Sequence, residues 1–242
     1  MKVIVSKDYD EMSKKAGVFF INLLKEKPQA KLGLATGSTP VGLYKELVKA
    51  NKEGEITFSF AKTVNLDEYV GIDPNNEQSY RYFMNQNLFN HVNIDKKNTY
   101  LPNADKRDEK FLEDYNKLLD DFGTRDIQVL GLGNNGHVAF NEPAKKLNKR
   151  TSIIELSQST IEANSRFFES KDEVPRYAIS MGMADIFNAK TLIVLASGEN
   201  KREVVRRILE ENEVYPEFPA SYLSLHPNVY LFVDEAAYGE EK

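Results

Sequence analysis

Short apolar segments without alternating polar residues recur along the chain, and this feature restricts the fold more than any other. The segments are Val3–Val5, Lys31–Leu34, Lys62–Leu66, Ile127–Leu132, Thr191–Ala196 and Val229–Val233. A strand buried on both faces has no solvent-facing side, so it lacks the polar alternation of a half-exposed strand. The chain is therefore predicted to form a mainly parallel sheet covered by helices on both faces.

Helical patterns lie between several of these segments. Apolar residues within 9–23, and again within 111–122, recur at spacings of three and four and form one stripe along each helix. Further helices are expected just after strands, over Val41–Lys52 and Asn200–Glu211. The sequence shows no internal repeat, low-complexity tract or Pro/Gly-rich linker. We therefore expect a Rossmann-like α/β fold in a single domain over residues 1–242.

The composition excludes several classes of protein. There is no cysteine among the 242 residues, which removes disulfide scaffolds, thiolate nucleophiles and Cys-based metal sites. The formal net charge is -5, and neither sign of charge forms long blocks, so no nucleic-acid surface is expected. No apolar stretch is long enough to span a bilayer, and the N-terminus does not resemble a signal peptide. We expect a cytoplasmic protein without nucleic-acid or membrane partners.

In a parallel sheet, ligands bind beyond the carboxyl ends of the strands, so the loops that leave the strands are the places to examine. The stretch ATGSTP follows the segment Lys31–Leu34 and leads into a helix. Gly37 permits a close backbone approach, and the unpaired amides of a helix start attract an anion, as do the hydroxyls of Ser38 and Thr39. The loop therefore suits a phosphate. It suits an ordinary capped turn equally well, and it lacks the lysine of a nucleoside triphosphate loop.

A second loop, NLDEYVG, places Asp67 directly after an apolar strand. A carboxylate beside a sheet core is partly desolvated, which raises its basicity and suits a general base. Acidic residues after strands are also common in turns and helix caps, so the motif alone does not decide between these roles.

The stretch GLGNNGHVAFNEP begins with the glycine spacing of a dinucleotide-binding turn. That turn must open a helix, and Pro143 prevents a regular helix from continuing through this segment. The nucleotide interpretation is therefore rejected. What remains is a turn that presents Asn135, His137 and Glu142, in which the carboxylate could orient the imidazole. A core histidine in a tight turn is the alternative, but the density of polar residues after a buried strand favours catalysis.

Other kinds of site have no support in the sequence. The spacings typical of metal ligands are absent, and so is the G-x-S-x-G elbow of a serine hydrolase. His91 and His226 are expected to be structural, and the charge of Arg150 is expected to be merely solvated.

Taken together, LGLATGSTP, NLDEYVG, GLGNNGHVAFNEP, STIEANSRFF and GENK resemble the glucosamine-6-phosphate deaminase family, in order and over nearly the whole chain. The resemblance implies a Rossmann-like fold and a role in amino-sugar catabolism. The implied reaction converts glucosamine 6-phosphate and water into fructose 6-phosphate and ammonia. It also implies that the protein uses no metal and no organic cofactor.

The resemblance assigns roles to the site residues. Asp67 would move a proton from C2 to C1 of the opened sugar, and His137, held by Glu142, would assist ring opening. Asn135 stands where some members have aspartate.

The substrate phosphate would lie on Gly37, Ser38 and Thr39, clamped by Arg166 and Lys201. Fixing the phosphate remotely would let binding energy position C2 against the base.

The chain departs from the family pattern after NEP, where Lys145 and Lys146 replace small residues, and at Ser152, where a basic or imidazole side chain is usual. In hexameric members these positions border a lid and an effector site. We therefore expect hyperbolic kinetics without activation by N-acetylglucosamine 6-phosphate. Because the chain ends soon after the last predicted strand, we also expect a monomer rather than a homo-oligomer.

Three alternatives stay open at this point. A 6-phosphogluconolactonase-like hydrolase shares the fold, but its glycine-rich motif does not continue into Phe-Asn-Glu-Pro. A non-catalytic sugar-phosphate sensor would normally carry a DNA-binding segment, and the sequence shows none. A deaminase for galactosamine 6-phosphate would differ only in a few hydroxyl contacts.

Overall fold

The computed structural model describes residues 1–102, 109–156, 158, 161–162, 168, 170 and 173–239. Its centre is a parallel sheet with the strand order β1-β10-β9-β6-β2-β3-β5. These strands are β1 Lys2–Ser6, β2 Lys31–Leu34, β3 Lys62–Asn65, β5 Thr99–Tyr100, β6 Ile127–Gly131, β9 Leu192–Ala196 and β10 Val229–Asp234. Each predicted strand segment is present, and the predicted α/β class is confirmed.

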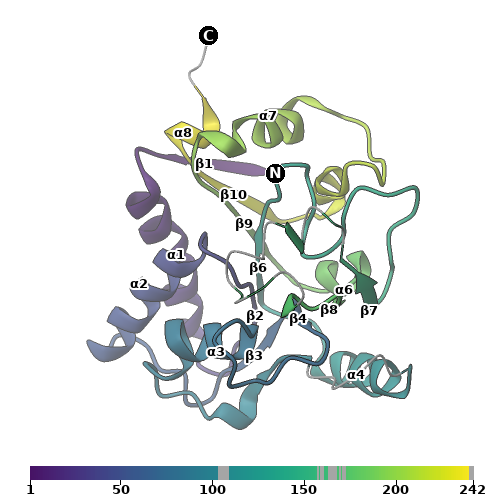
Figure 1. Cartoon of the computed structure of the whole chain (residues 1–242). Coiled ribbons are helices and arrows are strands. Elements are labelled where there is room, and N and C mark those ends of the chain that lie inside the picture. Colours follow the sequence, from purple (N-terminus) through teal and green to yellow (C-terminus); the bar gives the residue numbers. More distant parts are fainter. Residues whose placement is uncertain are drawn as a thin grey trace.

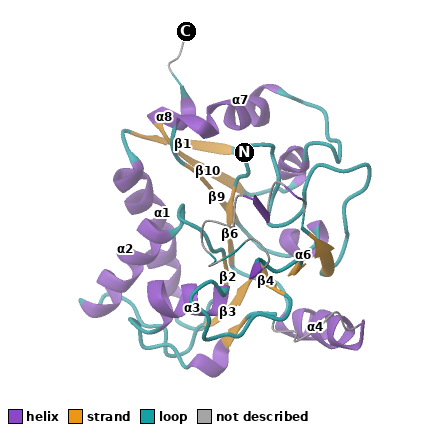
Figure 2. Cartoon of the chain, in the orientation of Figure 1, coloured by secondary structure: helices purple, strands orange, loops and turns teal. Residues whose placement is uncertain are grey.

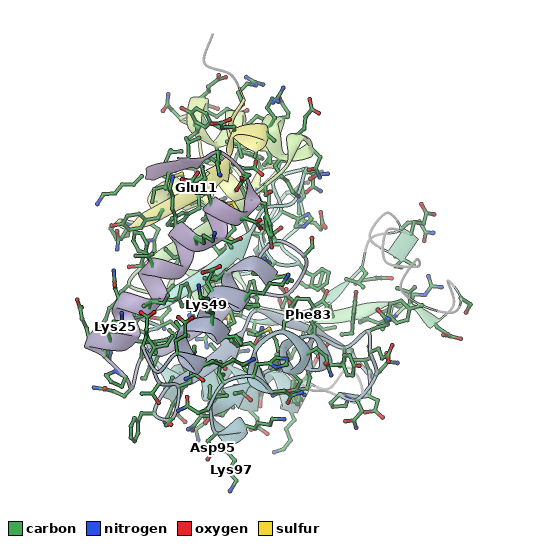
Figure 3. All side chains as sticks on the ribbon, turned by 90° about the vertical axis from the view of Figure 1, so that its left-hand side faces the viewer. Glu11, Lys25, Lys49, Phe83, Asp95 and Lys97 are labelled. Atoms are coloured by element: carbon green, nitrogen blue, oxygen red, sulfur yellow. The ribbon has the colours of Figure 1, made fainter. Side chains whose placement is uncertain are left out.

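Helices lie on both sides of this sheet, and α1 and α2 pack against each other on one of them (Figure 1). The α-helices are α1 Tyr9–Glu26, α2 Val41–Lys52, α3 Tyr80–Met84, α4 Glu109–Phe122, α6 Met183–Phe187, α7 Arg202–Glu210 and α8 Glu235–Tyr238. Lys25 of α1 and Lys49 of α2 are exposed on the outer surface of the α1–α2 layer (Figure 3). Within the described residues, no helix combines the length and apolar character that a membrane span requires.

Helix α1 illustrates how the sequence sets these elements. It begins after Asp8, whose side chain accepts a hydrogen bond from the backbone N–H of Glu11 at 2.8 Å and so caps the first turn. Its inner face buries Met12, Ala16, Phe20 and Leu24, together with two small residues. The predicted stripe within 9–23 lies partly at the edge of this face, because Phe19 and Leu23 are only half-buried.

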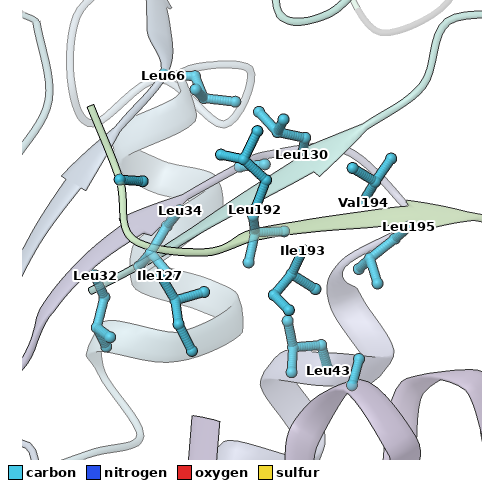
Figure 4. Close-up of a cluster of buried hydrophobic side chains, with 14 of the residues drawn as sticks. Leu32, Leu34, Leu43, Leu66, Ile127, Leu130, Leu192, Ile193, Val194 and Leu195 are labelled. Atoms are coloured by element: carbon cyan, nitrogen blue, oxygen red, sulfur yellow. The ribbon is translucent and has the colours of Figure 1, made fainter. Parts of the chain in front are cut away.

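The main core lies between the sheet and its helices. Leucine, isoleucine and valine side chains of β2, β6 and β9 form its centre, and Leu43 of α2 packs with them (Figure 4). Their complete burial removes apolar surface from water, which stabilises the fold by roughly 25 cal/mol for each Å².

A second, antiparallel sheet with the order β4-β8-β7 lies beside the main one. Its strands are β4 Asp67–Tyr69, β7 Ser152–Glu155 and β8 Tyr177–Ser180. The expectation that Asp67 lies in a loop was wrong. The chain leaves the main sheet after Asn65 and enters the small sheet at Asp67, because β8 supplies a pairing partner there.

Long loops leave the carboxyl ends of the strands in Figure 2 (teal). Chain connections run in opposite directions from two neighbouring strands at the middle of the sheet. From β2 the chain crosses to β3 on one side. From β6 it passes through β7 and β8 of the small sheet and returns to the main sheet on the other side, at β9. Ligands of open α/β sheets bind at the carboxyl edge beside such a switch point, and the loops after β2 and β6 lie at this edge.

Candidate active site

Asp67 is a buried carboxylate at the start of β4. Its side chain is 7% exposed, and within the described part of the chain it has no hydrogen-bond or ion-pair partner. Burial raises the pKa of Asp67 to about 8, with a smaller contribution from the negative charge of Glu68. A carboxylate with this pKa takes up a proton readily near neutral pH, which is the property of a general base.

Glu68 has a different role from its neighbour. Its carboxylate accepts hydrogen bonds from the backbone N–H groups of Tyr69, Tyr80 and Arg81 at 2.9 to 3.0 Å. The last two belong to the first turn of α3, so Glu68 caps that helix. Burial raises the pKa of Glu68, and these donors oppose that shift because they favour the ionised form. Glu68 therefore has a structural role as the cap of α3.

Three side chains of the loop after β6 form one connected group. The Nδ1 atom of His137 lies 3.3 Å from Oε1 of Glu142 and 2.8 Å from Oδ1 of Asn135. Asn135 in turn donates from Nδ2 to Oε2 of Glu142 at 2.7 Å. The structure thus brings together the three residues that the sequence places in this loop. Asn135 bridges the other two, which its sequence position alone does not reveal.

The backbone of this loop needs its glycines. A Cβ atom on Gly133 would lie 2.2 Å from the imidazole ring of His137, and one on Gly136 would lie 2.2 Å from the ring of Phe218. Gly136 also has φ +85°, and Ala139 has φ 53°, a conformation that is uncommon without glycine. The glycine spacing therefore serves a tight turn around the imidazole rather than a nucleotide.

Backbone and amide hydrogen bonds tie this loop to the strand of Asp67. The side chain of Asn141, 5% exposed, donates to the carbonyl oxygen of Met181 at 2.8 Å. The N–H of Met181 donates to the carbonyl oxygen of Leu66 at 2.9 Å. A second link runs through Ser180, the strand partner of Asp67, whose hydroxyl accepts from the N–H of Phe140 at 3.1 Å. Asp67 and the histidine group, which come from two distant segments, are therefore held in one framework.

The loop after β2 offers unpaired donors at the adjacent strand end. Gly37 has φ +95° with open space where a side chain would lie, and it and Ser38 are exposed. Within the described part of the chain, the backbone N–H groups of Gly37, Ser38 and Thr39 have no acceptor, and neither hydroxyl has a partner. Three amides and two hydroxyls at the start of α2 can therefore bind an anion.

Lys201 lies in the short 3-10 helix Glu199–Lys201 after β9, next to the loop after β6. Its ammonium group donates to the carbonyl oxygen of Leu132 at 2.6 Å and to Oδ1 of Asn134 at 2.7 Å. Burial lowers the pKa of Lys201. Arg166, the second predicted phosphate ligand, lies outside the described residues.

Two hollows elsewhere on the surface contain none of these groups. They border α4, with volumes of about 530 and 410 Å³. The smaller one is lined by Lys31 and Lys62, which begin β2 and β3, so it lies at the opposite, amino edge of the sheet. No group of three or more potential metal ligands occurs among the residues that the structure describes.

One charge was misjudged from the sequence. Arg150 was expected to be merely solvated, but its Nε lies 2.9 Å from Oδ1 of Asp185, which is 7% exposed. Asp185 also accepts a hydrogen bond from the hydroxyl of Thr151 at 2.9 Å. The buried carboxylate of Asp185 on α6 thus fixes the segment that leads into β7. No pattern in the sequence indicated that Asp185 would be buried there.

The fold and the site define a Rossmann-like α/β protein with a buried carboxylate, a histidine group and a glycine-containing loop at the carboxyl edge of its sheet. Comparison with known proteins specifies this class further. Residues 8–231 match the family described as glucosamine-6-phosphate isomerases/6-phosphogluconolactonase, and the chain belongs to this family.

Similar proteins cover the chain almost completely. Glucosamine-6-phosphate deaminase of Clostridium perfringens (strain 13 / Type A) is 51% identical, with 98% of each chain covered. That of Thermoanaerobacter pseudethanolicus is 47% identical, covering 98% of this chain and 94% of its own. A solved structure of a monomeric glucosamine-6-phosphate deaminase has a TM-score of 0.93 at 40% identity, again with 98% of each chain covered.

The lactonase branch is more distant. The 6-phosphogluconolactonase of Thermotoga maritima has a TM-score of 0.73 at 20% identity, with 96% of this chain and 99% of that chain covered. A similarity at this level of identity concerns the fold alone.

Proposed function

We propose that the protein converts glucosamine 6-phosphate and water into fructose 6-phosphate and ammonia. The observation that carries this proposal is the buried Asp67, which has no partner among the described residues. Its pKa is raised, and it is held in one framework with the His137 group. The resemblance of the chain to deaminases over its whole length agrees with this chemistry. Lactone hydrolysis would need no base placed like Asp67.

The reaction divides between the two sets of groups. His137, oriented by Asn135 and Glu142, assists opening of the sugar ring at the ring oxygen. Asp67 then removes the proton from C2 of the open chain, which leaves an enolamine, and returns a proton to C1. The resulting imine at C2 adds water and releases ammonia. A single carboxyl group can carry the proton between adjacent carbons because its pKa lies near neutrality.

The phosphate supplies the binding energy away from the reacting carbons. The amides and hydroxyls of Gly37, Ser38 and Thr39 receive the dianion, and Arg166 and Lys201 supply positive charge. Because this contact is remote from C1 and C2, it positions C2 against the base without blocking the reaction.

The decisive experiment measures ammonia and fructose 6-phosphate from the purified protein supplied with glucosamine 6-phosphate. Parallel reactions contain galactosamine 6-phosphate or 6-phosphogluconolactone. Release of both products from the glucosamine compound supports the proposal. Faster release from galactosamine 6-phosphate would show that this epimer is the substrate. Production of acid from 6-phosphogluconolactone would show that the protein is a hydrolase. Binding of a sugar phosphate without turnover would show that it is a sensor.

The pH dependence provides an independent prediction. Only the ionised form of Asp67 can accept the C2 proton, and burial raises its pKa to about 8 in the free protein. We therefore expect kcat/KM to rise with pH by about tenfold per unit below that pKa and to level off above it. Initial rates at low substrate concentration between about pH 6 and 9 check this. A rate that stays constant across this range would contradict the assignment of the base.

We further propose that the protein acts as a monomer in the cytoplasm. A monomeric deaminase of the same fold supports this. So do Lys145 and Lys146, which stand in place of small residues, and Ser152, which stands in place of a basic or imidazole side chain. We expect hyperbolic kinetics that do not change when N-acetylglucosamine 6-phosphate is added, because an effector acts only through different affinities for two states. Sedimentation and rate curves with and without this ligand check both points, and a sigmoidal curve that it makes hyperbolic would refute them.

A further inference from the structure

The hydroxyl of Tyr9 lies directly behind the loop that holds Gly37, Ser38 and Thr39. Tyr9 is the first residue of α1, 29 positions before Ser38 in sequence. Its hydroxyl proton is shared between the carbonyl oxygens of Ser38 and Thr39, at 3.1 and 3.0 Å. The hydroxyl oxygen accepts a hydrogen bond from the N–H of Gly42 at 2.7 Å. One phenol group thus joins three backbone groups of the loop and of the first turn of α2.

These contacts determine which way the loop amides point. In a trans peptide the C=O and the following N–H point in opposite directions, and no cis peptide occurs within the described residues. Because the carbonyl of Ser38 points at Tyr9, the N–H of Thr39 must point away from it. The same reasoning applies to Tyr44 of α2, whose fully buried hydroxyl donates to the carbonyl oxygen of Ala35 at 2.5 Å. The N–H of Thr36 therefore points away from Tyr44.

The approach of Tyr9 depends on the absence of a side chain at residue 42. A Cβ atom on Gly42 would lie 2.2 Å from Oγ of Ser13 and 3.0 Å from the hydroxyl oxygen of Tyr9. Gly42 is the second residue of α2, and it is buried. The close contact between α1 and the start of α2 accounts for glycine at this position.

We propose that Tyr9 is a positioning residue for the substrate phosphate. Its hydroxyl holds the carbonyl groups of Ser38 and Thr39 to the rear, so that the N–H of Thr39 faces the anion, and no carbonyl does, before the anion arrives. Without this hydroxyl, the carbonyl of Ser38 keeps only the N–H of Val41, at 3.3 Å, and the carbonyl of Thr39 has no donor among the described residues. The loop can then rotate a carbonyl toward the phosphate, and it must be reordered on binding. This inference rests on the proposed function of the loop as the phosphate site.

The test is Tyr9→Phe, which keeps the ring and removes the hydroxyl. We expect KM for glucosamine 6-phosphate and the inhibition constant of inorganic phosphate to rise in parallel by about three- to tenfold, with kcat nearly unchanged. The matched control is Tyr230→Phe, which removes a hydroxyl that contacts Lys2 on β1 instead. If Tyr9→Phe does not fold, Gly42→Ala disturbs the same hydroxyl from the other side and should raise both constants together.

The outcomes separate this inference from the proposed function. A lower melting temperature with both constants unchanged would show that Tyr9 serves stability alone, and a fall in kcat with unchanged phosphate inhibition would also overturn the proposal. Ser38→Ala supplies the second comparison. If it weakens phosphate binding while Tyr9→Phe does not, the loop binds the phosphate and the role of Tyr9 is wrong. If phosphate does not inhibit the unaltered protein, the proposed phosphate site is wrong, and the role of Tyr9 falls with it.

Discussion

Asp67→Asn is expected to lower kcat by about 10³- to 10⁴-fold, near the upper end of what general base catalysis contributes. Asparagine has nearly the same shape and fits the same buried space at the start of β4, but it cannot accept the C2 proton. KM should change little, because the proposed phosphate contacts lie on other loops. Steady-state rates of ammonia release measure both constants.

Two further observations make this test specific. In deuterated water, the unaltered protein should introduce solvent deuterium at C1 of fructose 6-phosphate, at least in part. The matched control is Asp126→Asn, which alters another buried carboxylate, one paired with Lys27 and Lys190 at the amino end of β6. This control should affect stability rather than kcat. Turnover by Asp67→Asn close to that of the unaltered protein would remove Asp67 from the mechanism.

Lys201→Ala should raise KM for glucosamine 6-phosphate by about one to two orders of magnitude, because a charge-assisted hydrogen bond contributes roughly 1.5 to 3 kcal/mol. The inhibition constant of inorganic phosphate should rise by a similar factor. The ammonium group is already held beside the loop after β6 by Leu132 and Asn134, so it needs little reordering to meet an anion.

The control for this substitution is Lys62→Ala, which removes the same charge from an exposed position at the amino end of β3. It should leave both constants unchanged. Glucosamine without a phosphate should be a very poor substrate for the unaltered protein. Equal use of glucosamine and its phosphate, or a fall in kcat alone in Lys201→Ala, would mean that the lysine does not hold the phosphate.

The main sheet was predictable from the sequence because each of its longer strands is a continuous apolar run, and such runs are stable mainly in the interior of a covered sheet. The small sheet was not predictable in this way. Strand β4 has the sequence Asp-Glu-Tyr, which is polar, and its partner β8 begins 108 residues after Tyr69 ends it. Pairing between strands so far apart in the sequence leaves no pattern in the residues of either strand. The position of Asp67 within a strand is therefore a result of tertiary structure.

The candidate site was predictable to a similar, partial extent. Residue types in a glycine-rich turn after a buried strand indicated Asn135, His137 and Glu142. The bridge from Asn135 to the other two depends on backbone angles at Gly136 and Ala139 that the sequence does not display. The role of Tyr9 was equally unpredictable, because a tyrosine in the apolar stripe of an amphipathic helix is expected to be a core residue. Its hydroxyl matters only where the helix start meets the loop.

One of the two links between Asp67 and the histidine loop passes through main-chain atoms at residue 181. The N–H and the C=O of this residue make the two hydrogen bonds, and its methionine side chain takes part in neither. Any amino acid except proline supplies the same two groups. A substitution at position 181 can therefore alter packing while it keeps both hydrogen bonds between the strand of Asp67 and the histidine loop. Position 141 has no such freedom, because its share of the link is a side-chain amide.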